Sequence, residues 1–169
     1  MVTGKVPGEA LSSKEMKEVT HEKWNPQVKY AWSCGEAMSR FLNELKKGKL
    51  VGRKCHKCGR ILFPPRMFCE ICFRPTDEWV YLPDTGTVMT YSVSYLDMDA
   101  NRIEEPILVG VIAIDGASED MGIMHYFGEM KPDDLTFGMH VKVVWKPEKE
   151  RVGAITDIKY FKPAKEGSK

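Results

Sequence analysis

The sequence predicts a mainly β protein with helices near its N-terminal end, and three observations carry this prediction. Apolar residues recur with helical spacing shortly before residue 48. Two Cys-x-x-Cys pairs follow within residues 55–72. From residue 85 onward, long stretches alternate between polar and apolar residues, as strands with one buried face do. With 169 residues, 43% of them hydrophobic, the chain is long enough for one typical domain or two small ones.

The first 33 residues are polar. Ser12 and Glu15 have the spacing of a capping box, which marks the start of a short helix. That helix has little apolar surface to bury, so two interpretations stay open for this arm: a frayed segment, or a segment ordered by a partner.

A second helix is predicted over residues 36–47. Its apolar residues follow the i, i+3, i+4, i+7 pattern of one helix face: Met38, Phe41, Leu42 and Leu45. Gly48 is suited to cap its C-terminal end. Because this face needs a surface to pack on, we expect residues 1–49 to form the part of the chain that docks on a partner.

The strongest chemical signal is the pair of Cys-x-x-Cys knuckles, which are separated by ten residues. This spacing is typical of a structural zinc site with four thiolate ligands, here Cys55, Cys58, Cys69 and Cys72. Four thiolates leave no coordination position for water, so the metal is predicted to hold the chain together and not to catalyse. Disulfides are the less favoured alternative, because the sequence opens without a secretory signal peptide. Residues 50–82 are therefore expected to form a zinc ribbon.

Five strands are predicted after the ribbon, in residues 85–95, 106–115, 121–127, 139–146 and 153–161. A short helical turn fits between the third and the fourth strand. Five antiparallel strands with this insertion suit a small Greek-key barrel of the OB-fold type. We assign residues 83–163 to that barrel and residues 164–169 to a tail. No apolar run approaches the roughly 18 residues of a membrane span, so we expect a soluble, cytoplasmic protein.

The knuckles, the Phe-Pro-Pro-Arg at residues 63–66 between them, and the barrel opening at residues 86–95 resemble the DUF35 family. Its members combine a rubredoxin-like zinc ribbon with an OB-fold and are associated with acyl-CoA; the likeness covers about residues 35–161. The resemblance implies an accessory subunit of a thiolase-superfamily complex that cleaves 3-oxoacyl-CoA and transfers the acyl group to CoA. The partner enzyme would supply nucleophile and base. Benzoylsuccinyl-CoA, acetoacetyl-CoA and a steroid side chain are candidate substrates by family analogy.

The distribution of charge bears on partners. Residues 44–66 sum to +7, whereas residues 97–134 sum to −8. The basic stretch has two interpretations: a solvated ribbon surface, or a cradle for the phosphates of coenzyme A formed by Arg66, Lys57 and Arg60. Arg66 is the best single candidate, because a guanidinium suits a phosphate or a partner carboxylate.

Single-stranded nucleic acid is the alternative partner, since zinc ribbons and OB-folds often bind it. Tyr91 and Tyr95 are candidate stacking platforms, although core or interface aromatics are the simpler interpretation. The acidic stretch in the barrel would repel phosphates, which makes nucleic acid the less favoured partner.

The sequence contains no credible active site of its own. Once four cysteines bind zinc, only Cys34 remains, and we expect it to be a small buried thiol. His125 and His140 lie within predicted strands and are expected to be structural. We therefore expect no catalytic residue in this chain.

Overall fold

A computed structural model describes residues 11–18, 29 and 31–164. The chain divides into two compact units, residues 1–32 and residues 33–169. In the first unit, helix α1 (Ser13–Glu18) begins with the predicted capping box. The backbone N–H of Ser12 donates to Glu15 Oε2 at 2.8 Å, and the N–H of Glu15 donates to the Ser12 hydroxyl at 3.3 Å. Most of the polar arm lies outside the described residues. Its two interpretations, a frayed segment or a segment ordered by a partner, both concern those residues.

The second unit begins with helix α2 (Gly35–Lys46). Gly48, two residues after the helix, adopts a left-handed conformation, as predicted for its C-terminal cap. Phe41 and Leu45 on its apolar face are 1% and 0% exposed, because the helix packs on strand β1 (Leu50–Lys54) and on the 3₁₀ helix η3 (Ile155–Asp157). The chain thus covers the Phe41 and Leu45 part of this face itself, whereas Met38 remains 39% exposed.

The ribbon consists of two small sheets. In one, β1 lies between β2 (Ile61–Leu62) and β5 (Glu78–Leu82). In the other, β3 (Phe68–Cys69) pairs with β4 (Arg74–Pro75). Strands β2, β3 and β4 have only two residues each and therefore show no readable alternation. The sequence predicts the knuckles but not these three strands.

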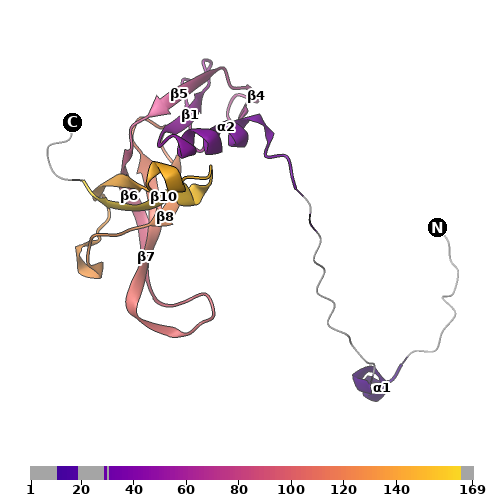
Figure 1. The fold of residues 1–169 in the computed structure, drawn as a ribbon. Helices are drawn as coiled ribbons and strands as arrows, with labels where there is room; N and C mark the ends of the chain where they lie inside the picture. Colours follow the sequence, from indigo (N-terminus) through magenta and orange to yellow (C-terminus); the bar gives the residue numbers. More distant parts are fainter. Residues whose placement is uncertain (1–10, 19–28, 30, 165–169) are drawn as a thin grey trace, which may run out of the picture. The chain divides into compact units, whose positions relative to one another are not determined.

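The five predicted barrel strands form one antiparallel sheet with the order β10-β9-β6-β7-β8. Their bounds are β6 Thr85–Leu96, β7 Arg102–Ile114, β8 Gly122–Tyr126, β9 His140–Trp145 and β10 Ile158–Pro163. The expected turn between the third and fourth strands is the 3₁₀ helix η1 (Pro132–Asp134), and η2 (Glu148–Glu150) follows β9. Two details differ from the prediction: β7 starts at residue 102, and the fifth predicted strand opens as η3. Figure 1 shows the long β6–β7 hairpin running beyond the other strands.

The barrel is not closed by a continuous ladder. Between β8 and β10, the described residues form a single parallel bridge, at Phe127 and Phe161. There the N–H of Gly128 donates to the carbonyl of Phe161 at 2.9 Å. Toward residues 122–126, the seam between β8 and β10 has no such bridge, and it opens beside η3.

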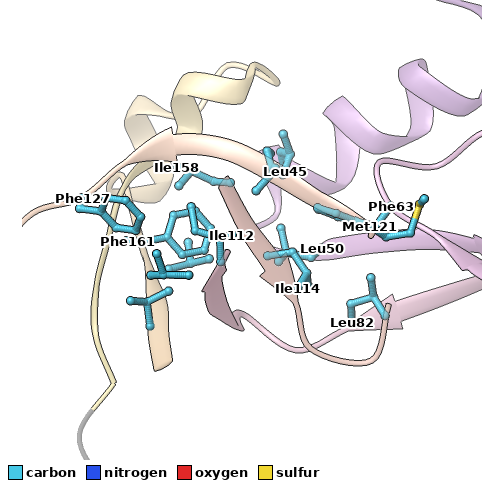
Figure 2. Packing of buried hydrophobic residues seen from close by; sticks show 14 of the residues in the cluster. Leu45, Leu50, Phe63, Leu82, Ile112, Ile114, Met121, Phe127, Ile158 and Phe161 are labelled. Carbon is cyan, nitrogen blue, oxygen red and sulfur yellow. The ribbon is translucent and has the colours of Figure 1, made fainter. Parts of the chain in front are cut away.

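Ribbon and barrel share one hydrophobic core. Figure 2 shows it running from Phe127 and Phe161 of the barrel to Phe63 and Leu82 of the ribbon. A reciprocal pair of hydrogen bonds also joins the two parts: the N–H of Ile61 donates to Ser118 Oγ at 2.8 Å, and the N–H of Ser118 donates to the carbonyl of Ile61 at 3.0 Å. The zinc ribbon therefore sits on the barrel through packing and is not a flexibly tethered module.

Candidate metal centre and its surroundings

The four predicted ligands converge. The sulfur atoms of Cys55, Cys58, Cys69 and Cys72 all lie within 4.8 Å of one another, and those of Cys58 and Cys69 are 3.6 Å apart. Sulfur atoms at the corners of a tetrahedron around zinc, each about 2.3 Å from the metal, are about 3.8 Å apart. The donor set and its spacing therefore fit a structural zinc ion.

Both knuckles use the same backbone device. The N–H of Gly59 donates to the carbonyl of Cys55 at 2.8 Å, and the N–H of Phe73 donates to that of Cys69 at 2.9 Å. Each donor residue has a positive φ, +76° in Gly59 and +49° in Phe73. Glycine adopts this conformation readily, whereas phenylalanine does so at a cost.

The electrostatics of the four thiols favour a bound cation. The backbone N–H of Cys58, with smaller contributions from Lys57 and neighbouring thiols, lowers the pKa of Cys55 to about 6 against the opposing effect of burial. Burial, followed by the sulfur atoms around it, raises the pKa of Cys72 to about 12. Four thiolates at this separation repel one another, and a divalent metal removes that repulsion.

Asp77 fixes the first knuckle from outside. It accepts a hydrogen bond from the N–H of His56 at 2.7 Å and a two-point interaction from Arg74 at 2.7 and 3.0 Å. The bond from His56 and the Arg74 guanidinium hold the pKa of the Asp77 carboxyl below its usual value. His56 lies outside the sulfur cluster, with Nε2 3.0 Å from Glu78.

The three predicted phosphate-binding residues lie in different environments. The guanidinium groups of Arg60 and Arg66 both face Glu70, at 3.4 and 4.0 Å. Arg60 is half-buried, whereas the Arg66 side chain is 55% exposed and Lys57 is exposed. Glu70 therefore competes with any phosphate at the two arginines, and Arg66 remains the more accessible of them.

One member of the basic stretch is not on the surface at all. Arg53 is 5% exposed, donates from Nε to Thr76 Oγ1 at 2.9 Å and from its terminal nitrogen to the Thr76 carbonyl. Its guanidinium lies 4.6 Å from the Trp79 ring, and Arg40 of α2 lies 4.5 Å from the same ring. The basic stretch is thus partly a structural clamp between α2 and the ribbon.

Cys34, His140 and Tyr91 lie in three different environments. Cys34 was expected to be buried but is exposed, because it precedes α2 and faces none of the core. His140 is exposed and contacts Asp115 at 2.8 Å. Tyr91 packs its ring against Phe137, with centroids 4.9 Å apart, so it is not a free platform for a base.

The environment of His125 differs from what the sequence predicts for an ordinary structural histidine. Its side chain is 8% exposed in the barrel interior, and its Nδ1 has no hydrogen-bond partner among the described residues. A signal was available: in residues 121–127, Ile123, His125 and Phe127 alternate on the face of β8 that points inward. An imidazole at an inward position of a strand deserves the same scrutiny as any buried polar group.

Two family models match consecutive parts of the chain. Residues 42–78 match a family model described as the rubredoxin-like zinc ribbon domain of ChsH2, and residues 79–146 match one described as the C-terminal OB-fold domain of ChsH2. A DUF35 domain-containing scaffold protein of Methanocaldococcus jannaschii is 33% identical over 117 residues, which cover 68% of this chain and 81% of the relative. This chain belongs to the DUF35 family.

Other DUF35 proteins agree. The scaffold protein of Methanothermobacter thermautotrophicus is 27% identical over 117 residues, covering 68% of this chain and 86% of its own. A DUF35 crystal structure from Sulfolobus solfataricus has a TM-score of 0.55 and 31% identity, covering 65% of this chain and 78% of the other. The Ltp2-ChsH2(DUF35) aldolase structure also has a TM-score of 0.55. It is 19% identical, and the match covers 82% of this chain and 98% of the other. At that identity it supports the fold alone.

These findings confirm the predicted fold class, a zinc ribbon followed by an OB-fold, and the four cysteines as a set able to bind metal. Among the described residues, none of the helices has the length and apolar character needed to span a bilayer.

Proposed function

We propose that this DUF35 chain is an accessory scaffold subunit that docks on a thiolase-superfamily enzyme acting on acyl-CoA. The scaffold role is the one named for both archaeal relatives. The observation that carries the proposal to this chain is an exposed apolar surface on the second knuckle, formed by Phe68, Ile71 and Phe73 and called here the knuckle surface.

The knuckle surface is exposed at a conformational cost. Phe68, Ile71 and Phe73 are 50%, 61% and 81% exposed. Phe73 occupies the left-handed position that Gly59 fills in the first knuckle, which costs a residue with a side chain about 1–2 kcal/mol. Its ring does not regain this energy by burial within the chain. Strain kept at an exposed position supports a role in contact with another molecule.

The chain's own side chains support a non-catalytic role. Four of the five cysteines converge on the metal centre, and Cys34 is exposed. Asp115 contacts both His140 and the Thr85 hydroxyl, so that hydroxyl bonds to the carboxylate and not to the imidazole that would act as its base. Nucleophile and base are accordingly assigned to the partner.

The chemistry of the complex follows from the family. A partner cysteine is acylated as 3-oxoacyl-CoA is cleaved, and free CoA then takes the acyl group. Arg66 and Lys57 are the exposed cations beside the metal centre that we assign to CoA phosphates or partner carboxylates; Arg60 assists from its half-buried position. Benzoylsuccinyl-CoA is one candidate substrate.

Co-expression with thiolase-superfamily proteins of the same genome, one at a time, tests this function. We expect one of them to copurify with the full-length chain and to cleave acyl-CoA, whereas the chain alone has no activity. Phe73→Gly should weaken the complex because the substitution removes the centre of the knuckle surface. Met98→Ser, a change at a fully exposed methionine of the β6–β7 hairpin, is the matched control and should leave the complex intact.

A truncation separates the knuckle surface from the arm. The cut belongs after residue 32, because removing residues 1–47 would strip Phe41 and Leu45 from the core. If the truncated chain loses the partner while Phe73→Gly keeps it, the arm is the docking element and the knuckle surface is not. Acyl-CoA cleavage by the full-length chain alone would contradict the accessory role.

A further inference from the structure

The open seam of the barrel contains a pocket. Its volume is about 480 Å³, within the range of small-molecule sites. Apolar side chains form most of its wall, among them Met124 and Tyr126 of β8, Ile155 of η3 and Ile158 of β10. The pocket lies where β8 and β10 separate, so it is a consequence of the incomplete closure of the sheet.

One wall of the pocket is held firmly. The buried carboxylate of Asp157 accepts hydrogen bonds from the N–H groups of Val152, Gly153 and Ala154, at 3.0, 2.7 and 3.2 Å. Helix α2 packs against the outside of the same segment, where Gly153 would bring a Cβ within 3.5 Å of the Leu42 carbonyl. The η3 side of the pocket is therefore fixed, whereas Met124 and Tyr126 on the β8 side are 70% and 55% exposed, so the pocket is open to solvent there.

His125 is a polar residue of the pocket lining and lies on the inward face of β8, whereas Met124 and Tyr126 lie on its outward face. Its Nε2 lies 3.4 Å from the carbonyl oxygen of Ile155, which can only accept, so Nε2 carries the proton. Burial lowers the pKa of His125 and outweighs the backbone groups of Ile155 and Tyr126, which favour the charged ring, so the neutral form with its lone pair on Nδ1 is favoured. Nδ1 is buried without a partner among the described residues. With the proton on Nε2, Nδ1 is the accepting nitrogen; because the surrounding side chains cover it, a donor reaches it only when they shift.

Two lysines complete the lining. Lys146, just after β9, and Lys159 of β10 both border the pocket. No ion pair within 4.0 Å is recorded for either ammonium group among the described residues; Lys159 Nζ lies 5.5 Å from the centre of the Tyr160 ring, and Lys146 acts on Asp157 at longer range. Two cations beside an apolar cavity favour a ligand with an apolar body and a negative end.

We propose that the seam pocket binds a small anionic amphiphile that carries a hydroxyl group on its apolar body. The body fills the cavity, the hydroxyl donates to Nδ1 of His125, and the carboxylate lies beside Lys146 and Lys159. The inference rests on the barrel alone and does not depend on the proposed thiolase partner or on the metal centre.

A pair of probes that differ by one hydroxyl tests the proposal: para-hydroxyphenylbutyrate and phenylbutyrate, each titrated into the zinc-loaded full-length chain by calorimetry. We expect the hydroxylated acid to bind about five-fold tighter, the factor that one ordinary net hydrogen bond provides. In His125→Phe this preference should vanish. In Lys146→Met with Lys159→Met both acids should bind more weakly by a similar factor.

Matched controls lie elsewhere on the barrel. His140→Phe changes an exposed histidine, and Lys142→Met changes a lysine 3.8 Å from Asp84, so neither should alter binding. Imidazole nitrogen NMR shifts of the unmutated chain give a second readout that needs no variant: the His125 Nδ1 signal should move with the hydroxylated acid and much less with the other.

Equal affinity of the two acids for the unmutated chain, with no distinct Nδ1 response, overturns the proposal. So does the absence of binding by either acid at about 1 mM, a concentration that reveals even weak complexes. If His125→Phe does not fold, as judged by its zinc content and circular dichroism, the Nδ1 shift decides the question alone.

Discussion

The metal centre and the seam pocket are two buried polar sites that differ in how their polar atoms are paired. At the metal centre, four sulfur atoms lie within 4.8 Å of one another, and a tetrahedral ion uses all of them. In the seam pocket, His125 has one nitrogen 3.4 Å from a carbonyl and the other without a partner. The first site closes on itself once its ion is bound. The second stays open toward a cavity.

The metal centre contributes stability, whereas the seam pocket is available to a ligand. A closed coordination shell adds its binding free energy to folding and leaves no position for substrate. An unpaired buried acceptor destabilises the chain by about 1–3 kcal/mol until a donor reaches it. The metal centre therefore stabilises the fold of the ribbon. The seam pocket lies where the barrel strands β8 and β10 do not pair.

Loss of one sulfur ligand is the largest expected effect. Cys69→Ser should abolish stoichiometric zinc binding and unfold residues 50–82, because structural zinc contributes on the order of 10 kcal/mol to the folding of small metal domains. Metal analysis measures the first result, and hydrogen exchange followed by mass spectrometry the second. Strands β6 and β7 should keep more protection than the ribbon.

Cys34→Ser is the matched control for this prediction, since it removes the exposed fifth cysteine and should retain one zinc per chain. A Cys69→Ser variant with a full zinc complement and a protected ribbon would show that the four sulfur atoms do not form the closed site described above.

The two sites also differ in how well the sequence predicts them. Cys55, Cys58, Cys69 and Cys72 are a local motif, because each knuckle positions its own pair of ligands within four residues. The seam pocket is assembled from two separate parts of the chain, β7 with β8 and η3 with β10, and His125 and Ile155 on its two sides are 30 positions apart in the sequence. Alternation predicts the strands but not where two of them fail to pair, so no spacing rule reveals the cavity.

Burial within the ribbon and α2 was also difficult to predict. Arg53 belongs to a basic run that suggests a solvated surface, yet it is buried because Thr76 and Trp79 lie against it. The apolar face of α2 suggests a docking helix, yet β1 and η3 cover Phe41 and Leu45. The covering segments are ones that the sequence did not predict as they are found: β1 and β5 of the ribbon were not predicted as strands, and η3 was predicted as part of a strand.

The second prediction concerns Asp157, whose substitution should weaken one wall of the seam pocket. Burial opposes ionisation of Asp157, but the three N–H donors outweigh it and hold the pKa of this carboxyl below its usual value. In Asp157→Asn an NH₂ group replaces one of the two accepting oxygens and faces at least one of these donors, which should lower the free energy of unfolding by about 1–3 kcal/mol. Urea unfolding of the zinc-saturated chain measures this.

Asp133→Asn, on the exposed surface of η1, is the control for that change and should alter stability by less than about 0.5 kcal/mol. Zinc content should stay at one per chain in both variants, because Asp157 does not contact the metal centre. A stable Asp157→Asn variant would mean that the pocket wall does not depend on this carboxylate.

A third prediction acts on the strained knuckle. Phe73→Gly should raise the free energy of unfolding by up to about 1 kcal/mol, because relief of the left-handed conformation exceeds the added entropy of glycine in the unfolded chain. Phe68→Gly should have the opposite sign, since Phe68 lies in extended strand β3 and gains nothing from glycine. Parallel urea titrations decide between the two signs, and loss of stability in Phe73→Gly would contradict the strain argument.

The smallest expected effect is a change in the pH dependence of stability. Burial lowers the pKa of His125 below its ordinary value of 6.5, so just below that pH the unfolded chain binds more protons than the folded chain. The free energy of unfolding therefore falls as the pH drops through this range, and His125 contributes part of the slope. His125→Phe should flatten the dependence between about pH 7 and pH 5.

The measurement compares the slope of unfolding free energy against pH for the two proteins at constant excess zinc. Proton competition for the four sulfur ligands is common to both proteins and cancels in the difference. The hydroxylated acid described above should steepen the slope of the unmutated chain, because it binds only the neutral imidazole. Identical slopes for His125→Phe and the unmutated chain would mean that His125 titrates normally, and the contrast between a closed metal centre and an open, unpaired seam would then be lost.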